Sequence, residues 1–321
     1  MSGSVTAEAI PTIDDVRAAA ARIKDAVRRT PVLRDAPGRD RFGFDLVMKL
    51  ECLQASGSFK ARGASNKTAL LPPADKARGL VTASGGNHGL GVAYAAANAG
   101  VPATIFLPSS TPASKVEKLK ARGADTRIIG AVWDEANAAA LAFAREQGAA
   151  YLHPFADAAV IAGQGTIALE LAAQAPDLDH LVVAIGGGGL ISGVAMAARA
   201  LNPKVKVIGV EPTGAPTLHE SVKAGRLITL DRIATRAGTL APKRSEQINL
   251  DLIRAHVAEI VLVSDDDMQK AAEALWFDYG LGVELSAAAA YAALRAGAFK
   301  PPAGSKVGIL VCGAGTDGMA T

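Results

Sequence analysis

Cysteine, aromatic residues and a surplus of charge are all scarce in this 321-residue chain, and each scarcity excludes a class of protein. The two cysteines, Cys52 and Cys312, are too few for a disulfide framework and lack metal-ligand spacing, so we expect a reducing cytoplasm. Aromatic residues make up 4% of the chain, which argues against an all-β sandwich. The 34 basic residues nearly balance the 31 acidic ones, so the charge pattern indicates neither a nucleic-acid-binding nor a membrane-surface protein.

Export signals and long apolar runs are missing as well. The start of the chain, MSGSVTAEAIPTIDD, has no basic segment followed by an apolar one. No apolar run is long and uninterrupted enough to span a bilayer. We therefore expect small molecules, or further copies of this chain, as partners, and neither nucleic acid nor a membrane.

Apolar residues, by contrast, make up 50% of the chain, and 33 residues are glycine. Short β-branched segments closed by Gly or Pro predict buried strands, and Ala-rich amphipathic segments such as 114–124 and 166–175 predict helices between them. The predicted strands are residues 44–51, 79–84, 101–108, 180–186, 205–212 and 306–313. This alternation predicts an α/β fold of mostly parallel twisted sheets flanked by helices. Ligands of such sheets bind at the carboxyl ends of the strands.

The richest glycine turn is AIGGGGLISG (184–193), which follows a predicted strand and opens a helix. Four glycines in a row allow several backbone N–H groups to converge on an anion at the helix N-terminus, so the turn predicts a phosphate site. It lacks the Gly-Lys-Ser/Thr element of a Walker loop and the dinucleotide spacing. Tight helix–strand packing explains one or two of the glycines but not four.

A second turn, TASGGNHGLG (82–91), also opens a helix. Its N–H groups and the hydroxyl of Ser84 can bind a carboxylate, and Asn87 can hydrogen-bond a ring oxygen. Helix capping explains Ser84 and Asn87 equally well, and His88 can be an ordinary surface histidine.

Two further glycine segments carry less weight. AGQGT (162–166) is expected to precede a helix and to cap it. GAGTDG (313–318) matches GxGxxG, but only three residues follow it, so no helix can carry a pyrophosphate and no acidic residue lies about 20 positions on. This context argues against a nicotinamide-dependent oxidoreductase.

Lys60 lies in SGSFKARGA (56–64), where the small residues allow the backbone to pass close to a neighbouring group or ligand. Taken alone, Lys60 is either a solvated surface charge or an amine nucleophile. An amine nucleophile, a phosphate turn without dinucleotide features, an amide for a ring oxygen and a carboxylate turn together indicate pyridoxal 5'-phosphate as cofactor.

Five motifs occur in the order SGSFKARGA, SGGNHG, VIAGQGTIALE, GGGGLISG and VCGAGTD. From about residue 28 to the C-terminus, this ordered set resembles the serine/threonine dehydratase group of the fold-type II (tryptophan-synthase β-like) pyridoxal-phosphate enzymes. The resemblance implies a large cofactor-binding domain of residues 1–69 and 157–321, a small domain of residues 70–156, and the cofactor between them. A homodimer is usual in such families.

The resemblance also implies site residues. Lys60 matches the catalytic Schiff-base lysine, Asn87 the residue at the cofactor's 3-hydroxyl, and Cys312 the group beside the pyridine nitrogen. Residues 186–190 match the phosphate loop, and Ser84, Gly86 and His88 lie in the turn that holds the substrate carboxylate. The cofactor-binding residues implied are Phe59, Lys60, Asn87, Gly186, Gly187, Gly188, Gly189, Leu190 and Cys312.

The activity implied is that of an ammonia-lyase that removes the β-hydroxyl of L-threonine, L-serine or a related 3-hydroxy amino acid, giving a 2-oxo acid and ammonia. Lys60 would remove the α-proton, because burial lowers the pKa of an amine. Three alternatives stay open: a serine racemase-like isomerase, a β-replacement or threonine-synthase-like enzyme, and a catalytically degenerate paralogue that binds an amino acid.

Several positions depart from the family pattern. Gly85 stands where the racemases have a serine as second base, which disfavours racemisation. Glu211 keeps one carboxylate of the family's metal site, but Thr217 stands where the second is often found, so we expect no metal and keep Glu211 as the remaining candidate ligand. The loop TLAPKRS (239–245) and the segment Glu284-Leu285-Ser286 alter the border of the substrate pocket, which leaves the preferred 3-hydroxy amino acid open.

Overall fold

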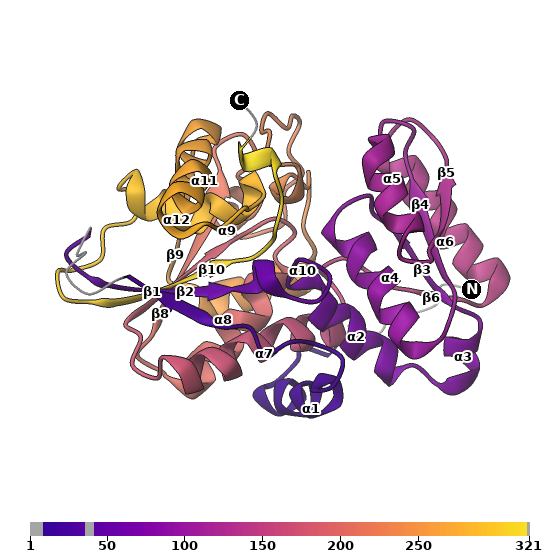
Figure 1. Ribbon diagram of the computed structural model, residues 1–321, viewed down its shortest axis with the longest axis horizontal. Helices are drawn as coiled ribbons and strands as arrows, with labels where there is room; N and C mark the ends of the chain where they lie inside the picture. The colour runs from indigo at the N-terminus through magenta and orange to yellow at the C-terminus, as the bar shows by residue number, and fades with distance from the viewer. Residues whose placement is uncertain (1–8, 36–41, 320–321) are drawn as a thin grey trace.

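The computed structural model describes residues 9–35 and 42–319 and arranges them as two lobes, which Figure 1 shows side by side. The larger lobe contains a six-stranded sheet in the order β1-β2-β10-β7-β8-β9. β1 is antiparallel to β2, and the other described neighbours in this sheet are parallel. Its strands are Val32–Arg34 (β1), Asp45–Leu50 (β2), Lys306–Val311 (β10), His180–Ala184 (β7), Lys206–Pro212 (β8) and Glu259–Val263 (β9).

Helices cover both faces of this sheet (Figure 1). α7 packs on α8 and α1 packs on α7 on one face, whereas α12 lies against β7 to β10 on the other with α11 outside it. The helices of this lobe are Ile13–Ile23 (α1), Ala158–Gln174 (α7), Gly189–Leu201 (α8), Thr217–Ala224 (α9), Gln247–His256 (α10), Asp265–Tyr279 (α11) and Ala289–Arg295 (α12). Because both faces are covered, β7 is buried along its whole length, in keeping with the apolar residues that follow His180.

The smaller lobe contains a four-stranded sheet in the order β5-β4-β3-β6, all of it parallel. Its strands are Asp125–Ile128 (β5), Ala103–Leu107 (β4), Leu80–Ala83 (β3) and Ala150–Tyr151 (β6). The helices around it are Lys60–Leu70 (α2), Pro73–Ala77 (α3), Asn87–Ala99 (α4), Ala113–Lys120 (α5) and Trp133–Gln147 (α6). These strands fall within the predicted range 70–156, and the predicted domain boundaries stay a prediction. The α/β fold with parallel-rich sheets and two lobes is confirmed.

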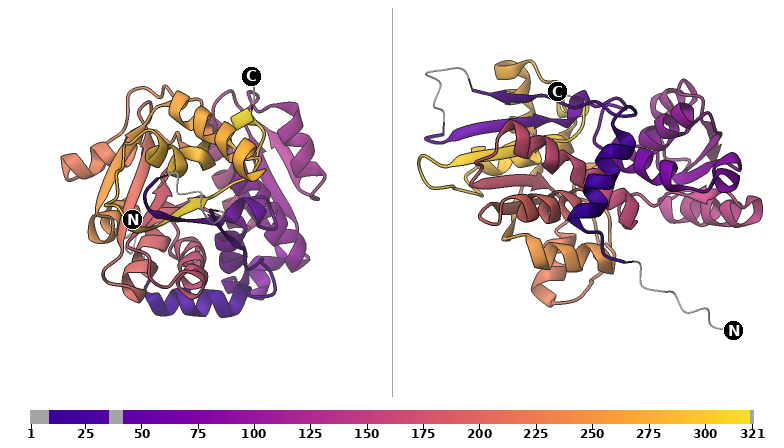
Figure 2. Two further views of the ribbon diagram at one scale, coloured as in Figure 1. Left: turned by 60° about the vertical axis from the view of Figure 1, so that its left-hand side comes forward. Right: turned by 90° about the horizontal axis from the view of Figure 1, so that it is seen from below.

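The lobes join along α2 and α7, which lie in direct backbone contact. A Cβ added at Gly163 of α7 would lie 2.6 Å from the Cα of Gly63 in α2, so both positions require glycine. α1 packs against α2, α7 and α8 and thus spans this junction, as the right-hand view of Figure 2 shows.

The prediction that AGQGT caps a helix is wrong, because these residues lie inside α7. The helix begins at Ala158, and the side chain of the preceding Asp157 caps it by accepting hydrogen bonds from the N–H groups of Ala159 and Val160. The glycines at 163 and 165 therefore serve close packing rather than capping. Gly163 faces α2, and a Cβ at Gly165 would lie 2.7 Å from Val16 of α1.

A buried ionic network fixes α2 against the larger lobe. Arg62, 1% exposed, donates to Glu51 at 2.7 Å and to Glu170 of α7 at 2.7 Å. Lys49 of β2 donates to the second oxygen of Glu170 at 2.6 Å. With every charge paired, the network holds the first turn of α2, and therefore Lys60, in place relative to both β2 and α7.

Candidate active site

Lys60 is the first residue of α2, and the turn before it is tied to the end of β10. The N–H of Phe59 donates to the carbonyl of Cys312 at 3.2 Å, and the N–H of Ala314 donates to the carbonyl of Gly57 at 2.8 Å. β10 is a central strand of the six-stranded sheet. Lys60 therefore lies at the carboxyl edge of that sheet, where parallel sheets bind ligands.

The Lys60 side chain contacts the segment that follows β6. Its Nζ donates to the carbonyl oxygen of Pro154 at 2.5 Å and lies 5.1 Å from the centroid of the Phe59 ring. Burial lowers the pKa of Lys60 to about 8, against the opposing influence of Cys312 and Glu284. A substantial fraction of this amine is thus neutral near physiological pH, as a nucleophile or general base requires.

The glycine turn, residues 186–190, follows β7 and begins α8. Gly188 has a φ of +96°, and side chains at Gly187 or Gly189 would overlap Phe155. The first N–H groups of a helix have no partner within it and carry partial positive charge. The turn thus presents backbone N–H groups suited to an anion at the carboxyl end of a central strand, next to Phe155.

The second turn, residues 84–88, lies at the carboxyl end of β3, and α4 begins at Asn87. The hydroxyl of Ser84 accepts the N–H of Gly86 at 3.3 Å. The imidazole of His88 is buried, with Nε2 lying 3.0 Å from the carbonyl oxygen of Leu152, and burial lowers its pKa to about 3. A substrate carboxylate can therefore meet the backbone N–H of His88 but not its neutral ring.

Glu284 belongs to this site, and the sequence placed it only at the pocket border. Its carboxylate accepts from the amide of Asn87 at 2.8 Å and from the hydroxyl of Thr239 at 3.2 Å, which joins the two lobes. Burial, together with Asp317, raises the pKa of Glu284 to about 7 in spite of these hydrogen bonds. Asn87 and Glu284 are 197 residues apart, so no local sequence pattern reveals the contact.

Cys312 directly follows β10 and is 4% exposed. Burial, followed by the nearby Glu284 carboxyl, raises the pKa of the Cys312 thiol far above its ordinary value. This thiol is therefore neutral at physiological pH.

Glu211 acts as a helix cap. Its two carboxylate oxygens accept the N–H groups of Leu218, at 2.9 Å, and His219, at 2.7 Å, in the first turn of α9. Burial raises the pKa of Glu211 to about 8. Thr217 donates its hydroxyl to the carbonyl of Pro242 at 2.7 Å, and residues 9–35 and 42–319 contain no group of three His, Cys, Asp or Glu placed to hold a metal ion. This donor set does not fit a divalent cation.

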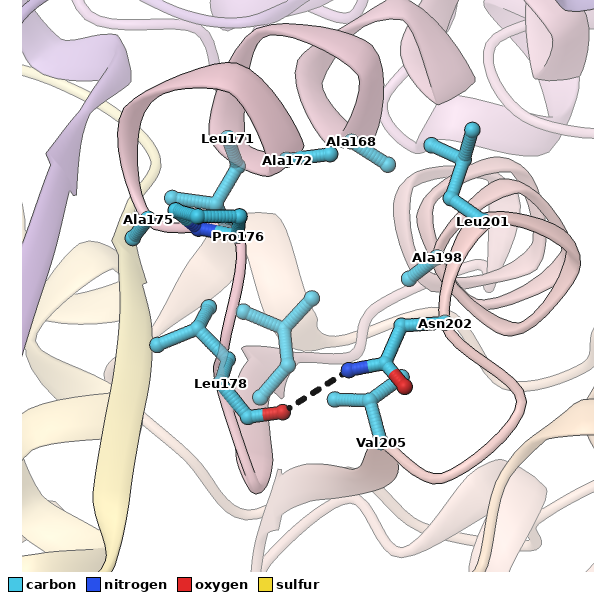
Figure 3. A pocket seen from close by; sticks show the side chains of 11 residues that line it. Ala168, Leu171, Ala172, Ala175, Pro176, Leu178, Ala198, Leu201, Asn202 and Val205 are labelled. Carbon is cyan, nitrogen blue, oxygen red and sulfur yellow. Dashed lines mark hydrogen bonds between the residues drawn. The ribbon is translucent and has the colours of Figure 1, made fainter.

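A small apolar pocket lies at the opposite end of the larger lobe, between the last turns of α7 and α8 (Figure 3). Asn202 donates to the carbonyl of Leu178 at 3.1 Å, and its amide oxygen accepts the N–H of Lys204 at 3.1 Å. The remaining lining is aliphatic, so the pocket supplies no reactive group.

Within the described part of the chain, no helix is long and apolar enough to cross a membrane.

Comparison with known proteins defines the class. Residues 23–313 match the family described as pyridoxal-phosphate dependent enzyme. The chain is 41% identical over 260 residues to the L-threonine ammonia-lyase of Thermotoga maritima, a match that covers 81% of this chain and 65% of that protein. It is 36% identical over 308 residues to the phenylserine dehydratase of Ralstonia pickettii, covering 96% and 94%. The structure of maize serine racemase matches with a TM-score of 0.92 and 37% identity over 95% of this chain and 94% of that one.

The chain therefore belongs to the pyridoxal-phosphate-dependent enzymes. Within them it belongs to the serine/threonine dehydratase group of fold type II, which the ordered motifs indicated.

Proposed function

We propose that this protein is an ammonia-lyase that converts a 3-hydroxy amino acid to a 2-oxo acid and ammonia. The observation that carries the proposal is the position of Lys60: a half-buried amine with a lowered pKa, at the carboxyl edge of the central strands and in contact with both lobes. The water lost with the β-hydroxyl is regained when the nitrogen is released, so the net products are the 2-oxo acid and ammonia.

The residues around Lys60 fit pyridoxal 5'-phosphate. The unpartnered N–H groups of residues 186–190 would hold its phosphate, and Asn87, oriented by Glu284, would hold its ring oxygen. Phe59 lies beside the lysine, and Cys312 would face the pyridine nitrogen as a neutral thiol. When bound, the cofactor supplies an electron sink for negative charge at the substrate α-carbon.

The chain's own groups determine what happens to the protons. The neutral Lys60 amine would take the α-proton, and the N–H groups at Gly86 and His88, with the hydroxyl of Ser84, would hold the carboxylate. A neutral Cys312 cannot fully protonate the ring nitrogen, which favours rapid loss of the β-hydroxyl over return of a proton to carbon.

Elimination is favoured over racemisation by the environment of Gly85. A Cβ there would lie 2.9 Å from the Thr111 methyl group and 3.4 Å from Leu107. The space that a second base would occupy on that face is thus already filled by the smaller lobe. The likeness to maize serine racemase nevertheless makes D-amino acid formation the alternative to measure.

We also propose that the enzyme is a cytoplasmic homodimer. Phe277 is 81% exposed and Trp276 is 47% exposed, and neighbouring aromatic residues so exposed favour a contact surface. Light scattering on a sizing column tests the dimer, and a monomer at micromolar concentration would contradict it.

The function is tested by measuring 2-oxo acid and ammonia from L-threonine, L-serine, L-threo-3-phenylserine and L-threo-3-hydroxyaspartate. We compare the wild type with Lys60→Ala and with Lys118→Ala, which removes an exposed lysine of α5. Release by the wild type and Lys118→Ala, but not by Lys60→Ala, is expected. Equal release by Lys60→Ala, or no release by a wild type that binds the cofactor, would contradict the lyase assignment. Chiral chromatography then separates an isomerase from a binding protein.

A further inference from the structure

Residues 129–133, which we call the edge segment, run along the carboxyl edge of the four-stranded sheet from β5 to β3. At one end, the N–H of Ile129 donates to the carbonyl of Leu107, the last residue of β4, at 2.8 Å. At the other end, the indole N–H of Trp133 donates to the carbonyl of Ala83, the last residue of β3, at 2.8 Å. The edge segment therefore covers the ends of the strands.

This edge is the one that faces the catalytic lysine. Lys60 contacts the carbonyl of Pro154, which follows β6 at the same edge. Ala83, which holds the indole, directly precedes the Ser84 turn. A Cβ at Gly86 of that turn would lie 3.7 Å from the methyl of Thr239, so the turn reaches the larger lobe. Trp133 therefore contacts the residue that directly precedes the turn that would hold the substrate carboxylate.

Trp133 leaves apolar surface uncovered even though its indole N–H is bonded. It is 43% exposed, and its neighbour Val132 is 53% exposed. A tryptophan fixed by its N–H offers a rigid ring face for a flat apolar group at low entropic cost. Because exposed apolar side chains at the rim of a site mark a binding surface, we attribute this face to the substrate.

The charges around Trp133 favour a neutral substituent. Asp134 and Glu135 follow it in the first turn of α6, and Glu135 accepts the N–H of Ala131 at 2.6 Å. These carboxylates repel an anionic substituent.

We propose that Trp133 is a specificity-determining residue that contacts the substituent on the substrate β-carbon and selects aryl 3-hydroxy amino acids over threonine and serine. The proposal rests on the proposed lyase function and names its substrate class. A methyl group or a hydrogen on the β-carbon is too small to cover the indole face, whereas a phenyl ring can stack on it or meet it edge to face.

The test measures kcat and KM for the four substrates named above with the wild type, Trp133→Ala, Trp133→Phe and Ile128→Ala. Ile128, 55% exposed in β5, is a control for loss of an exposed apolar side chain from the same lobe. We expect the wild type to have its highest kcat/KM with L-threo-3-phenylserine. Trp133→Ala should raise KM for that substrate about tenfold or more and change KM for L-threonine less than about twofold. Trp133→Phe should retain most of the preference, and Ile128→Ala should leave it unchanged.

The proposal is overturned by a wild-type preference for L-threonine, L-serine or L-threo-3-hydroxyaspartate, or by a Trp133→Ala variant that keeps the wild-type order of KM values. A uniform fall of kcat on all substrates would instead assign Trp133 a structural role and overturn it as well. If Trp133→Ala does not fold, Trp133→Phe and the wild-type ranking still decide. No 2-oxo acid from any substrate would contradict the proposed function itself, which distinguishes the two failures.

Discussion

Glu284 is a residue whose protonation is set by its surroundings. One of its oxygens accepts hydrogen bonds from Asn87 and Thr239, yet burial and Asp317 raise its pKa to about 7. Because this value lies above that of a carboxyl in an unfolded chain, near 4.3, folding favours the protonated form. The stabilisation that Glu284 contributes is complete at pH values below the pKa of the unfolded chain, and it is lost as the pH rises through 7.

We therefore expect Glu284→Gln to lose less stability than the wild type when the pH of the cofactor-free protein rises from 5 to 8. Between these two pH values the wild type should lose about 2 kcal/mol more of its free energy of unfolding than Glu284→Gln does. Urea unfolding of both proteins at each pH measures this difference. Glu211, whose pKa is also raised, is present in both proteins, so its contribution cancels. Parallel pH profiles for the two proteins would contradict the assignment.

Which residues could be predicted depends on whether their role is local. Lys60, Asn87 and the glycines at 186–189 lie in short motifs, so the sequence marks them as candidates, and the resemblance of the ordered motifs to the family predicts their roles. Glu284 and Trp133 act through contacts with Asn87 and Ala83 that folding alone creates. Trp133 also begins a helix whose pattern looks like an ordinary amphipathic one, so nothing in its neighbourhood marks it out.

At the scale of elements, the contact between α2 and α7 allows a stringent test. Gly163→Ala would place a methyl group 2.6 Å from the backbone of Gly63, which cannot move without displacing α2. Overpacking of this kind costs about 1–3 kcal/mol, more than the helix propensity gained from alanine. We expect a loss of about 2 kcal/mol in the free energy of unfolding. Gly238→Ala, where a Cβ meets nothing within 4 Å, is the control and should be neutral.

Six predicted strands correspond to β2, β3, β4, β7, β8 and β10, because central parallel strands are continuous apolar runs. The unpredicted strands lie at edges or are very short. β5 reads Asp-Thr-Arg-Ile and is mostly exposed, and β6 has two residues. The start of α7 was also missed, since the glycines that suggest a turn are explained only by a second helix packed against them.

At the scale of the molecule, the groups that would hold the cofactor come from both lobes: Asn87 from the smaller, residues 186–190 from the larger. Bound cofactor should therefore stabilise the whole structure, by about 2.7 kcal/mol at a hundredfold excess over Kd. We expect the melting temperature to rise by a few degrees with pyridoxal 5'-phosphate. Pyridoxal, which lacks the phosphate, is the control and should give a clearly smaller shift. Equal shifts would show that the glycine turn does not bind phosphate.

The contact between α2 and α7 has a mechanical consequence. The chain enters the four-stranded lobe through α2 and leaves it into α7, so the two ends of the lobe meet where Gly63 and Gly163 touch. A rigid rotation of that lobe would have its hinge near this point. Lys60 lies within one helical turn of Gly63 and would therefore hardly move. The parts of the lobe farthest from this point would move most, so that the lobe could close over a substrate while Lys60 stays nearly still.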